Sequence, residues 1–207
     1  MRVARAIFLG LLPVAAVHFG IRFAGVERLW VTVALYHAIC VAVPALHGLS
    51  REELKDARRW ALASVAIAVA LAAGIWAVGR AFHARGWISP PEARSLLLAV
   101  EPWTVFVVYS LAVNPFMEEW YWRAFLLPRS GIAMGGALFG LMHFAGFVVV
   151  LSPLDAALLS APAFASGFAW GWMRRASGSL WPCVVTHLGA DAGILALFQL
   201  IRTTPSP

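Results

Sequence analysis

Long apolar runs without a charged residue fill most of this chain of 207 residues and limit what it can fold into. About 20 residues of α-helix cross the hydrocarbon core of a bilayer, so each such run is a candidate membrane span. The runs are residues 6–21, 29–50, 60–79, 102–117, 130–154, 156–173 and 180–201, the last with one charged residue, Asp191. They show no alternation with a period of two, which favours helices over a barrel. The sequence therefore predicts an all-α fold, a polytopic transmembrane bundle of about seven spans.

The composition agrees with lipid as the main solvent. Apolar residues make up 61% of the chain and charged residues 13%, and the mean hydropathy is +0.79. Soluble domains are about half apolar and about a quarter charged, so an ordinary cytosolic enzyme, a disordered chain and a disulfide-rich secreted domain are excluded. Cys40 and Cys183 both lie inside apolar runs, and we expect two small buried side chains rather than a disulfide or a thiolate metal site.

The basic residues predict an orientation in the membrane. They form no basic face with interleaved aromatics, so we expect no nucleic-acid partner. The first run follows Arg2 and Arg5 as in a signal peptide, but no clear small-residue cleavage site follows, and we expect a retained span. With a cytoplasmic N-terminus, nine Lys and Arg residues lie inside and six outside, with Arg123 counted on neither side. The inner set is Arg2, Arg5, Arg51, Lys55, Arg58, Arg59, Arg129, Arg174 and Arg175, and the outer set is Arg22, Arg28, Arg80, Arg85, Arg94 and Arg202. This excess favours the N-terminus inside, with residues 1–207 as a single integral membrane domain.

Two adjacent acids follow the fourth run. A charge at the centre of a membrane helix costs about 2.5–3.5 kcal/mol, so Glu118 and Glu119 indicate function. Asn114 and Pro115 are typical of a helix start, which places the acids in its first turns. Glu119 and Arg123 are four residues apart and can pair on one helix face, whereas Glu118 points about 100° away. The alternative is an interfacial helix start with ordinary capping acids.

Two further runs contain ionisable groups. His143 lies deep in run 130–154, where a lone histidine is often a satisfied core residue. His187 and Asp191 are four residues apart in the last run, and a carboxylate one turn from an imidazole can accept its N–H and fix its tautomer. A purely structural pair is the alternative. Because isolated ionisable groups in lipid would lack partners, we expect the three segments to converge on a polar cavity inside the membrane.

The three sites form motifs in a fixed order, Glu118-Glu119-x-x-x-Arg123, Phe139-x-x-x-His143 and His187-x-x-x-Asp191. Their residue types, order and spacing resemble the CPBP family, also called ABI, of glutamic-type intramembrane proteases. That family includes CAAX prenyl endopeptidases and bacterial relatives linked to bacteriocin processing and immunity. The resemblance is confined to a motif-bearing core of about residues 100–201. It implies a helical membrane fold with an active-site cavity that opens toward the cytoplasm, and a location in the bacterial inner membrane.

The resemblance also implies a role for each motif residue. Glu118 is the general base, and His143 holds the same water. His187 and Asp191 lie on the side of the oxyanion, where relatives carry Asn in place of Asp191. Because an ionised carboxylate would repel an oxyanion, Asp191 is either protonated or orients His187, which then donates alone, and we expect the second. Structural support is expected from Glu119, Arg123 and Phe139.

Water is also the most economical nucleophile on the residues alone, since no Ser or Cys has an evident base nearby in the sequence. We expect no cofactor, although Glu118, His143, His187 and Asp191 would also make a plausible Zn²⁺ site. The expected partners are the bilayer and a membrane-associated protein or peptide that is cut near its C-terminus or leader. A prenylated CAAX tail and a bacterial sorting or leader peptide are both open. A non-catalytic immunity factor or transporter with the same polar cluster is the alternative function.

Overall fold

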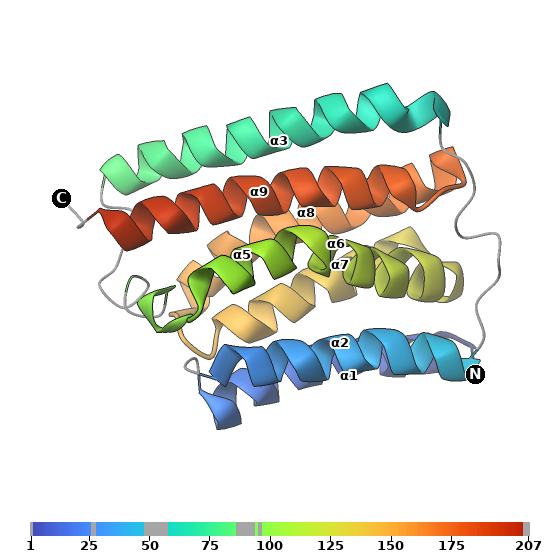
Figure 1. Cartoon of the computed structure of the whole chain (residues 1–207). Helices are drawn as coiled ribbons and strands as arrows, with labels where there is room; N and C mark the ends of the chain where they lie inside the picture. Colours follow the sequence, from blue (N-terminus) through green and yellow to red (C-terminus); the bar gives the residue numbers. More distant parts are fainter. Residues whose placement is uncertain (1, 26–27, 48–57, 86–93, 95–96, 205–207) are drawn as a thin grey trace. The chain divides into compact units, whose positions relative to one another are not determined.

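The regular structure of the chain is helical. The computed structural model describes residues 2–25, 28–47, 58–85, 94 and 97–204, and these contain no strand. The helices are α1 (Arg2–Ala24), α2 (Leu29–His47), α3 (Arg58–Ala84), α5 (Trp103–Ala112), α6 (Asn114–Glu119), the π-helix η3 (Trp120–Leu126), α7 (Leu127–Phe147), α8 (Pro153–Ser177) and α9 (Trp181–Thr203) (Figure 1). The predicted all-α polytopic bundle is confirmed.

Five helical stretches within the described residues are long and apolar enough to cross a membrane: Val3–Ala24, Leu29–His47, Arg59–Ala84, Asn114–Phe147 and Trp181–Thr203. The predicted number of seven spans is not confirmed. The fourth predicted run, 102–117, is divided between the 10-residue α5 and the start of α6, so it does not form one helix of spanning length. The predicted run 156–173 lies within α8, which is not one of the five stretches. The chain is an integral membrane protein.

The helices form two compact units. The first unit comprises Met1–Ala57 and Met117–Leu180, and the second comprises Arg58–Phe116 and Trp181–Pro207. We describe each unit by itself, and the single domain expected from the sequence stays a prediction.

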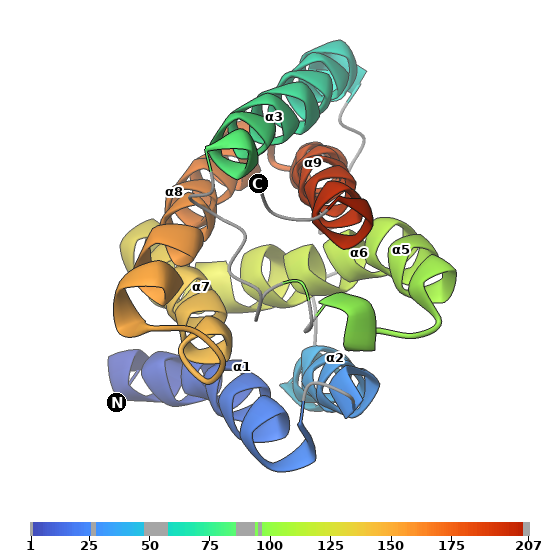
Figure 2. The same cartoon turned by 90° about the vertical axis from the view of Figure 1, so that its left-hand side faces the viewer.

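Small residues bring the helices of the first unit close together. Here α1 packs against α2 and α7, and α7 packs against α8 (Figures 1 and 2). A Cβ atom added to Gly167 on α8 would lie 2.8 Å from the carbonyl oxygen of Gly136 on α7. Close backbone approach at small residues is the usual way in which membrane helices gain contact energy, because lipid provides no hydrophobic drive between them. This seam fixes the position of α7, which carries Phe139 and His143.

The second unit is built around α9, which packs along α3 and also contacts α5 (Figure 2). A Cβ atom on Gly189 would collide with the backbone of Ala68, and one on Gly193 would lie 2.8 Å from the carbonyl oxygen of Ala72. Gly189 and Gly193 therefore face α3. His187 and Asp191 each precede one of these glycines by two residues, about 200° around the helix, so they lie on a different face of α9.

The segment from α6 to α7 is continuous but irregular. It passes from an α-helix into the π-helix η3, which has hydrogen bonds to the fifth rather than the fourth residue, and then into α7. Gly131, near the start of α7, has φ 78° and ψ 172°, so the helix axis breaks there. Only glycine adopts this conformation without strain, since it lacks a Cβ atom. The acids Glu118 and Glu119 directly precede the π-helix, a type of segment often found at functional sites.

Candidate functional site

The two predicted acids are buried in different surroundings. Glu118 is 5% exposed and Glu119 is not exposed. A Glu119 Oε1 atom lies 3.1 Å from Nη1 of Arg123, so the ion pair predicted from their spacing is present. The Arg123 guanidinium, itself 2% exposed, also lies over the rings of Phe139 and Trp170, at 4.3 and 5.1 Å from their centroids. A planar cation between a carboxylate and two aromatic faces is well stabilised in a dry site.

His143 continues this set of contacts along α7. Its ring packs edge-on against Phe139, with the centroids 4.7 Å apart. Its Nδ1 lies 3.0 Å from the carbonyl oxygen of Phe139, an acceptor, so Nδ1 carries the proton in this hydrogen bond. In a neutral imidazole Nε2 is then the nitrogen with a lone pair. The motif residues Glu119, Arg123, Phe139 and His143 thus form one connected group in the first unit.

Glu118 has a different set of neighbours, which come from α2 and η3. The hydroxyl of Tyr36 hydrogen-bonds to the Glu118 carboxyl, and the thiol of Cys40 lies close enough to interact with its charge. The indole Nε1 of Trp122 donates to the Tyr36 hydroxyl at 3.0 Å. Consecutive helical residues point about 100° apart, which explains why Glu118 and Glu119 meet different partners.

The second unit holds the other motif pair. Nε2 of His187 lies 3.5 Å from Oδ1 of Asp191, an ion-pair distance that is long for a hydrogen bond. The amide of Asn114, the first residue of α6, donates from Nδ2 to Oδ2 of Asp191 at 3.2 Å. The two oxygens of Asp191 therefore face different partners. His187 is 3% exposed, so the pair is largely shielded from solvent.

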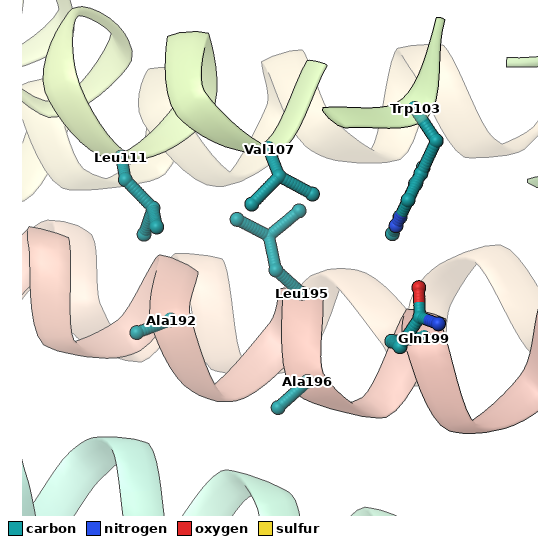
Figure 3. A pocket seen from close by; sticks show the side chains of 7 residues that line it. All are labelled: Trp103, Val107, Leu111, Ala192, Leu195, Ala196 and Gln199. Carbon is teal, nitrogen blue, oxygen red and sulfur yellow. The ribbon is translucent and has the colours of Figure 1, made fainter. Parts of the chain in front are cut away.

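An apolar hollow lies beside this pair in the second unit. Its volume is about 280 Å³, and α5 and α9 line it with Trp103, Val107, Leu111, Ala192, Leu195, Ala196 and Gln199. Trp103 and Gln199 lie at the same end of the hollow, and Ala192 and Leu111 lie at the other (Figure 3). Ala192 directly follows Asp191, so the hollow runs along α9 from the motif toward the C-terminus. Its walls suit a hydrocarbon chain rather than a polar ligand.

The structure thus gathers the predicted residues into two groups, one in each unit. The first group is Glu118, Glu119, Arg123, Phe139 and His143, and the second is His187 with Asp191. Within the part of the chain that the structure describes, no three His, Cys, Asp or Glu side chains are gathered as a metal site requires.

Sequence reasoning did not assign a role to the partners that lie far away in the chain. Tyr36, Trp170 and Asn114 reach the motif residues from other helices, and no local spacing indicates such contacts. Asn114 was expected to cap a helix, and its side chain instead contacts Asp191, 77 residues away. One weak signal was available for Tyr36. The chain has only three Tyr, and a phenol in a span needs a polar partner.

Comparison with known proteins finds one similar family, and the similarity covers the part of the chain that holds the motifs. Searches of curated proteins and of solved structures found no match. A family model described as type II CAAX prenyl endopeptidase Rce1-like matches residues 100–193, which include all three motifs. Residues 100–193 are thus similar to the Rce1-like type II CAAX prenyl endopeptidases, as the order of the three motifs predicted.

Proposed function

We propose that this protein is an intramembrane endopeptidase that cleaves a membrane-associated protein or peptide near its C-terminus or leader with an activated water molecule. The proposal rests chiefly on the separation of the two acids. Glu119 is held by Arg123, whereas Glu118 is buried beside the hydroxyl of Tyr36. A buried carboxylate that a neutral group contacts can take up a proton and return it, as a general base and acid must. The similarity of residues 100–193 to a protease family supports the same function.

Each motif residue has a role in the proposed reaction. Glu118 removes a proton from water while the oxygen attacks the scissile carbonyl carbon, and the tetrahedral oxyanion forms. The carbon–nitrogen bond then breaks, and Glu118 returns its proton to the leaving amine, so that water is divided between the two products. Nε2 of His143 accepts a hydrogen bond from the same water, as its tautomer allows. His187, oriented by Asp191, donates to the oxyanion.

The joint action of the two groups is inferred from the order of the motifs within the family match. The proposed reaction needs no metal, because a carboxylate and an imidazole supply the base and the position of the water. Zn²⁺ bound by Glu118, His143, His187 and Asp191 is the competing mechanism, and it predicts different behaviour of an Asp191 variant, described in the Discussion.

The experiment uses purified full-length protein in lipid nanodiscs and a lipid-modified peptide with a C-terminal extension. The wild type is expected to release the extension and, in H₂¹⁸O, to place one ¹⁸O atom in the new carboxyl group. Glu118→Gln is expected to abolish release, whereas Glu101→Gln, which removes an exposed carboxylate, is expected to retain it. Release by Glu118→Gln at the wild-type rate would contradict the catalytic assignment. Tight peptide binding without any release would favour the non-catalytic alternative.

The same peptide assay distinguishes the two candidate substrate classes, a prenylated tail and a sorting or leader peptide. The apolar hollow along α9 suits a hydrocarbon chain, so we expect a prenylated peptide to be cut faster than its unmodified form. Equal rates for the two, with faster cleavage of a peptide carrying a membrane-spanning anchor, would instead support a sorting or leader substrate.

The proposed orientation has the N-terminus in the cytoplasm of a bacterial cell, as the distribution of basic residues favours. Single cysteines introduced near Arg5 and near Arg22 in a chain lacking Cys40 and Cys183 would test it. An impermeant maleimide added to intact cells is expected to label the position near Arg22 and not the one near Arg5. The opposite pattern would reverse the orientation.

A further inference from the structure

The buried hydroxyl of Tyr36 has a defined hydrogen-bonding direction. Tyr36 is 5% exposed, and its hydroxyl contacts the indole of Trp122, the carboxyl of Glu118 and the thiol of Cys40. An indole N–H only donates, so the Tyr36 oxygen accepts from Trp122 at 3.0 Å. The single phenolic proton is then available for a carboxylate, which only accepts. The result is a directed chain from Trp122 through Tyr36 to Glu118.

The groups described around this contact have partners or chemistry of their own. Cys40, one turn after Tyr36 on α2, contacts the same hydroxyl, but a thiol is a weak hydrogen-bonding partner. On the segment of Glu118 itself, Glu119 is paired with Arg123. From α7, which packs against η3, the ionisable group of the site is His143, whose Nδ1 is directed to the carbonyl of Phe139. Among these groups, the Tyr36 hydroxyl is a neutral donor that hydrogen-bonds to Glu118.

We propose that Tyr36 is a positioning residue, which holds the Glu118 carboxyl in the orientation that the reaction needs. This inference rests on the function proposed above. A hydrogen bond to one carboxyl oxygen fixes the rotation of the side chain, and the lone pairs of the other oxygen are then aimed in one direction. The bond from Trp122 fixes the Tyr36 hydroxyl in turn. Such support by residues behind the reacting group keeps a base within the short distance that proton transfer requires.

The chain offers a matched control for this inference. Tyr121 is also fully buried in the first unit, and its hydroxyl donates to the carbonyl oxygen of Leu9 on α1 at 2.6 Å. Tyr36→Phe and Tyr121→Phe therefore remove the same atom from two buried positions. Each variant loses one buried hydrogen bond, but only Tyr36→Phe releases the Glu118 carboxyl. Any general effect of a lost buried hydroxyl on folding appears in both.

The first measurement is the division of the effect between kcat and KM. For Tyr36→Phe we expect kcat to fall about ten- to a hundredfold, the range for one hydrogen bond to a charged group, with KM within about twofold of wild type. For Tyr121→Phe we expect kcat and KM close to the wild type. Equal kcat values for Tyr36→Phe and Tyr121→Phe, whether reduced or unchanged, would overturn the inference.

The second measurement does not depend on cleavage. In protein labelled with ¹³C at its Glu carboxyl groups, the infrared band lost in Glu118→Gln reports the Glu118 carboxyl. This band is expected to shift in Tyr36→Phe and to stay in place in Tyr121→Phe. If the wild type cleaves no peptide but the band still shifts in Tyr36→Phe, the proposed function is rejected and the contact between Tyr36 and Glu118 is retained. An unshifted band would reject the positioning role even if the wild type is an active protease.

Discussion

At the level of single residues, the ion pair of Glu119 and Arg123 is a fully buried charged contact of the first unit. Glu119 is not exposed and Arg123 is 2% exposed, so neither charge has access to bulk solvent. Removing one partner of a buried pair leaves the other charge uncompensated, which is more damaging than replacing both by apolar groups. The pair therefore gives a prediction about folding as well as activity.

Arg123→Ala is expected to lower the folded yield and to destabilise the protein by about 3–5 kcal/mol, because Glu119 stays buried without its cation. Activity is expected to fall with the yield. The double variant Glu119→Leu/Arg123→Met, which removes both charges, is expected to recover much of the yield. Size-exclusion profiles and thermal unfolding in detergent measure these effects. Normal yield of Arg123→Ala with lost cleavage would instead place Arg123 in contact with the substrate.

Asp191→Asn separates the two mechanisms. In the structure the two Asp191 oxygens face His187 and Asn114, and an amide has only one acceptor oxygen. We therefore expect activity to be reduced but retained, with no effect of EDTA or o-phenanthroline on the wild type. Metal analysis of both proteins accompanies the cleavage assay. Stoichiometric zinc in the wild type that is lost together with activity in Asp191→Asn would establish the metal mechanism and leave the protease function intact.

The local contacts of the site were predictable, and the distant ones were not. Glu119 with Arg123 and His187 with Asp191 are each four residues apart, and helix geometry brings such pairs together in any context. Tyr36 contacts Glu118 across 82 residues of chain, and Asn114 contacts Asp191 across 77. Such contacts depend on how helices pack, which a single sequence does not specify.

At the level of helices, the seam between α3 and α9 depends on two glycines. Gly189 allows the backbone of α9 to touch Ala68, and Gly193 allows a similar approach to Ala72. The contact area of such a seam grows as the helices approach, and a single methyl group is enough to hold them apart. The seam also determines which face of α9 presents His187 and Asp191.

Gly189→Ala is expected to destabilise the protein, because the new Cβ atom would collide with the Ala68 backbone, which cannot rotate away. Gly74→Ala on α3 is the matched control, since no atom lies within 4 Å of the position of its Cβ. It is expected to be neutral or to stabilise the helix by up to about 1 kcal/mol, because Ala favours helix over Gly. Thermal unfolding measures both. Equal stability of the two variants would mean that the α3–α9 contact is looser than described.

Helix boundaries show a similar limit to prediction. The apolar runs correctly indicated helices, because a span must satisfy its backbone hydrogen bonds internally. They did not indicate that α5 ends at Ala112 or that residues 114–147 form one helical segment with a π-helix inside it. Neither the short α5 nor the π-helix changes the local hydropathy, so hydropathy alone could not reveal them.

At the level of the whole chain, Arg202 ties the end of α9 to the start of α5. Its Nη2 lies 2.8 Å from Oε1 of Glu101, and its guanidinium lies 4.4 Å from the ring centroid of Trp103. The hydrogen bond from Arg202, together with a backbone N–H from Trp103, lowers the pKa of Glu101 from its usual 4.5. This contact joins segments that are 101 residues apart at the edge of the apolar hollow.

Glu101→Gln tests the contribution of this charge through its dependence on pH. Because the folded protein lowers the pKa of Glu101, the ionised form contributes stability above pH 4.5, and the contribution is lost as the pH falls through the lowered pKa. The wild type is therefore expected to unfold at a higher temperature than Glu101→Gln at pH 7, with a difference that shrinks below pH 4.5. Differential scanning fluorimetry from pH 7 to about pH 3 covers this range. A difference that does not change with pH would show that Glu101 acts without its charge.

The π-helix has a consequence for how the chain tolerates changes of length. Deleting one residue between Trp120 and Leu126 would restore ordinary α-helical hydrogen bonding, and the side chains before the deletion would rotate by about 100° relative to those after it. Glu118 and Glu119 would then face a different direction relative to Phe139 and His143 on α7, although every motif residue would still be present. The direction of a motif side chain in this protein therefore depends on its count along the chain as much as on its identity, and an alignment that opens a gap here would pair residues that occupy different positions.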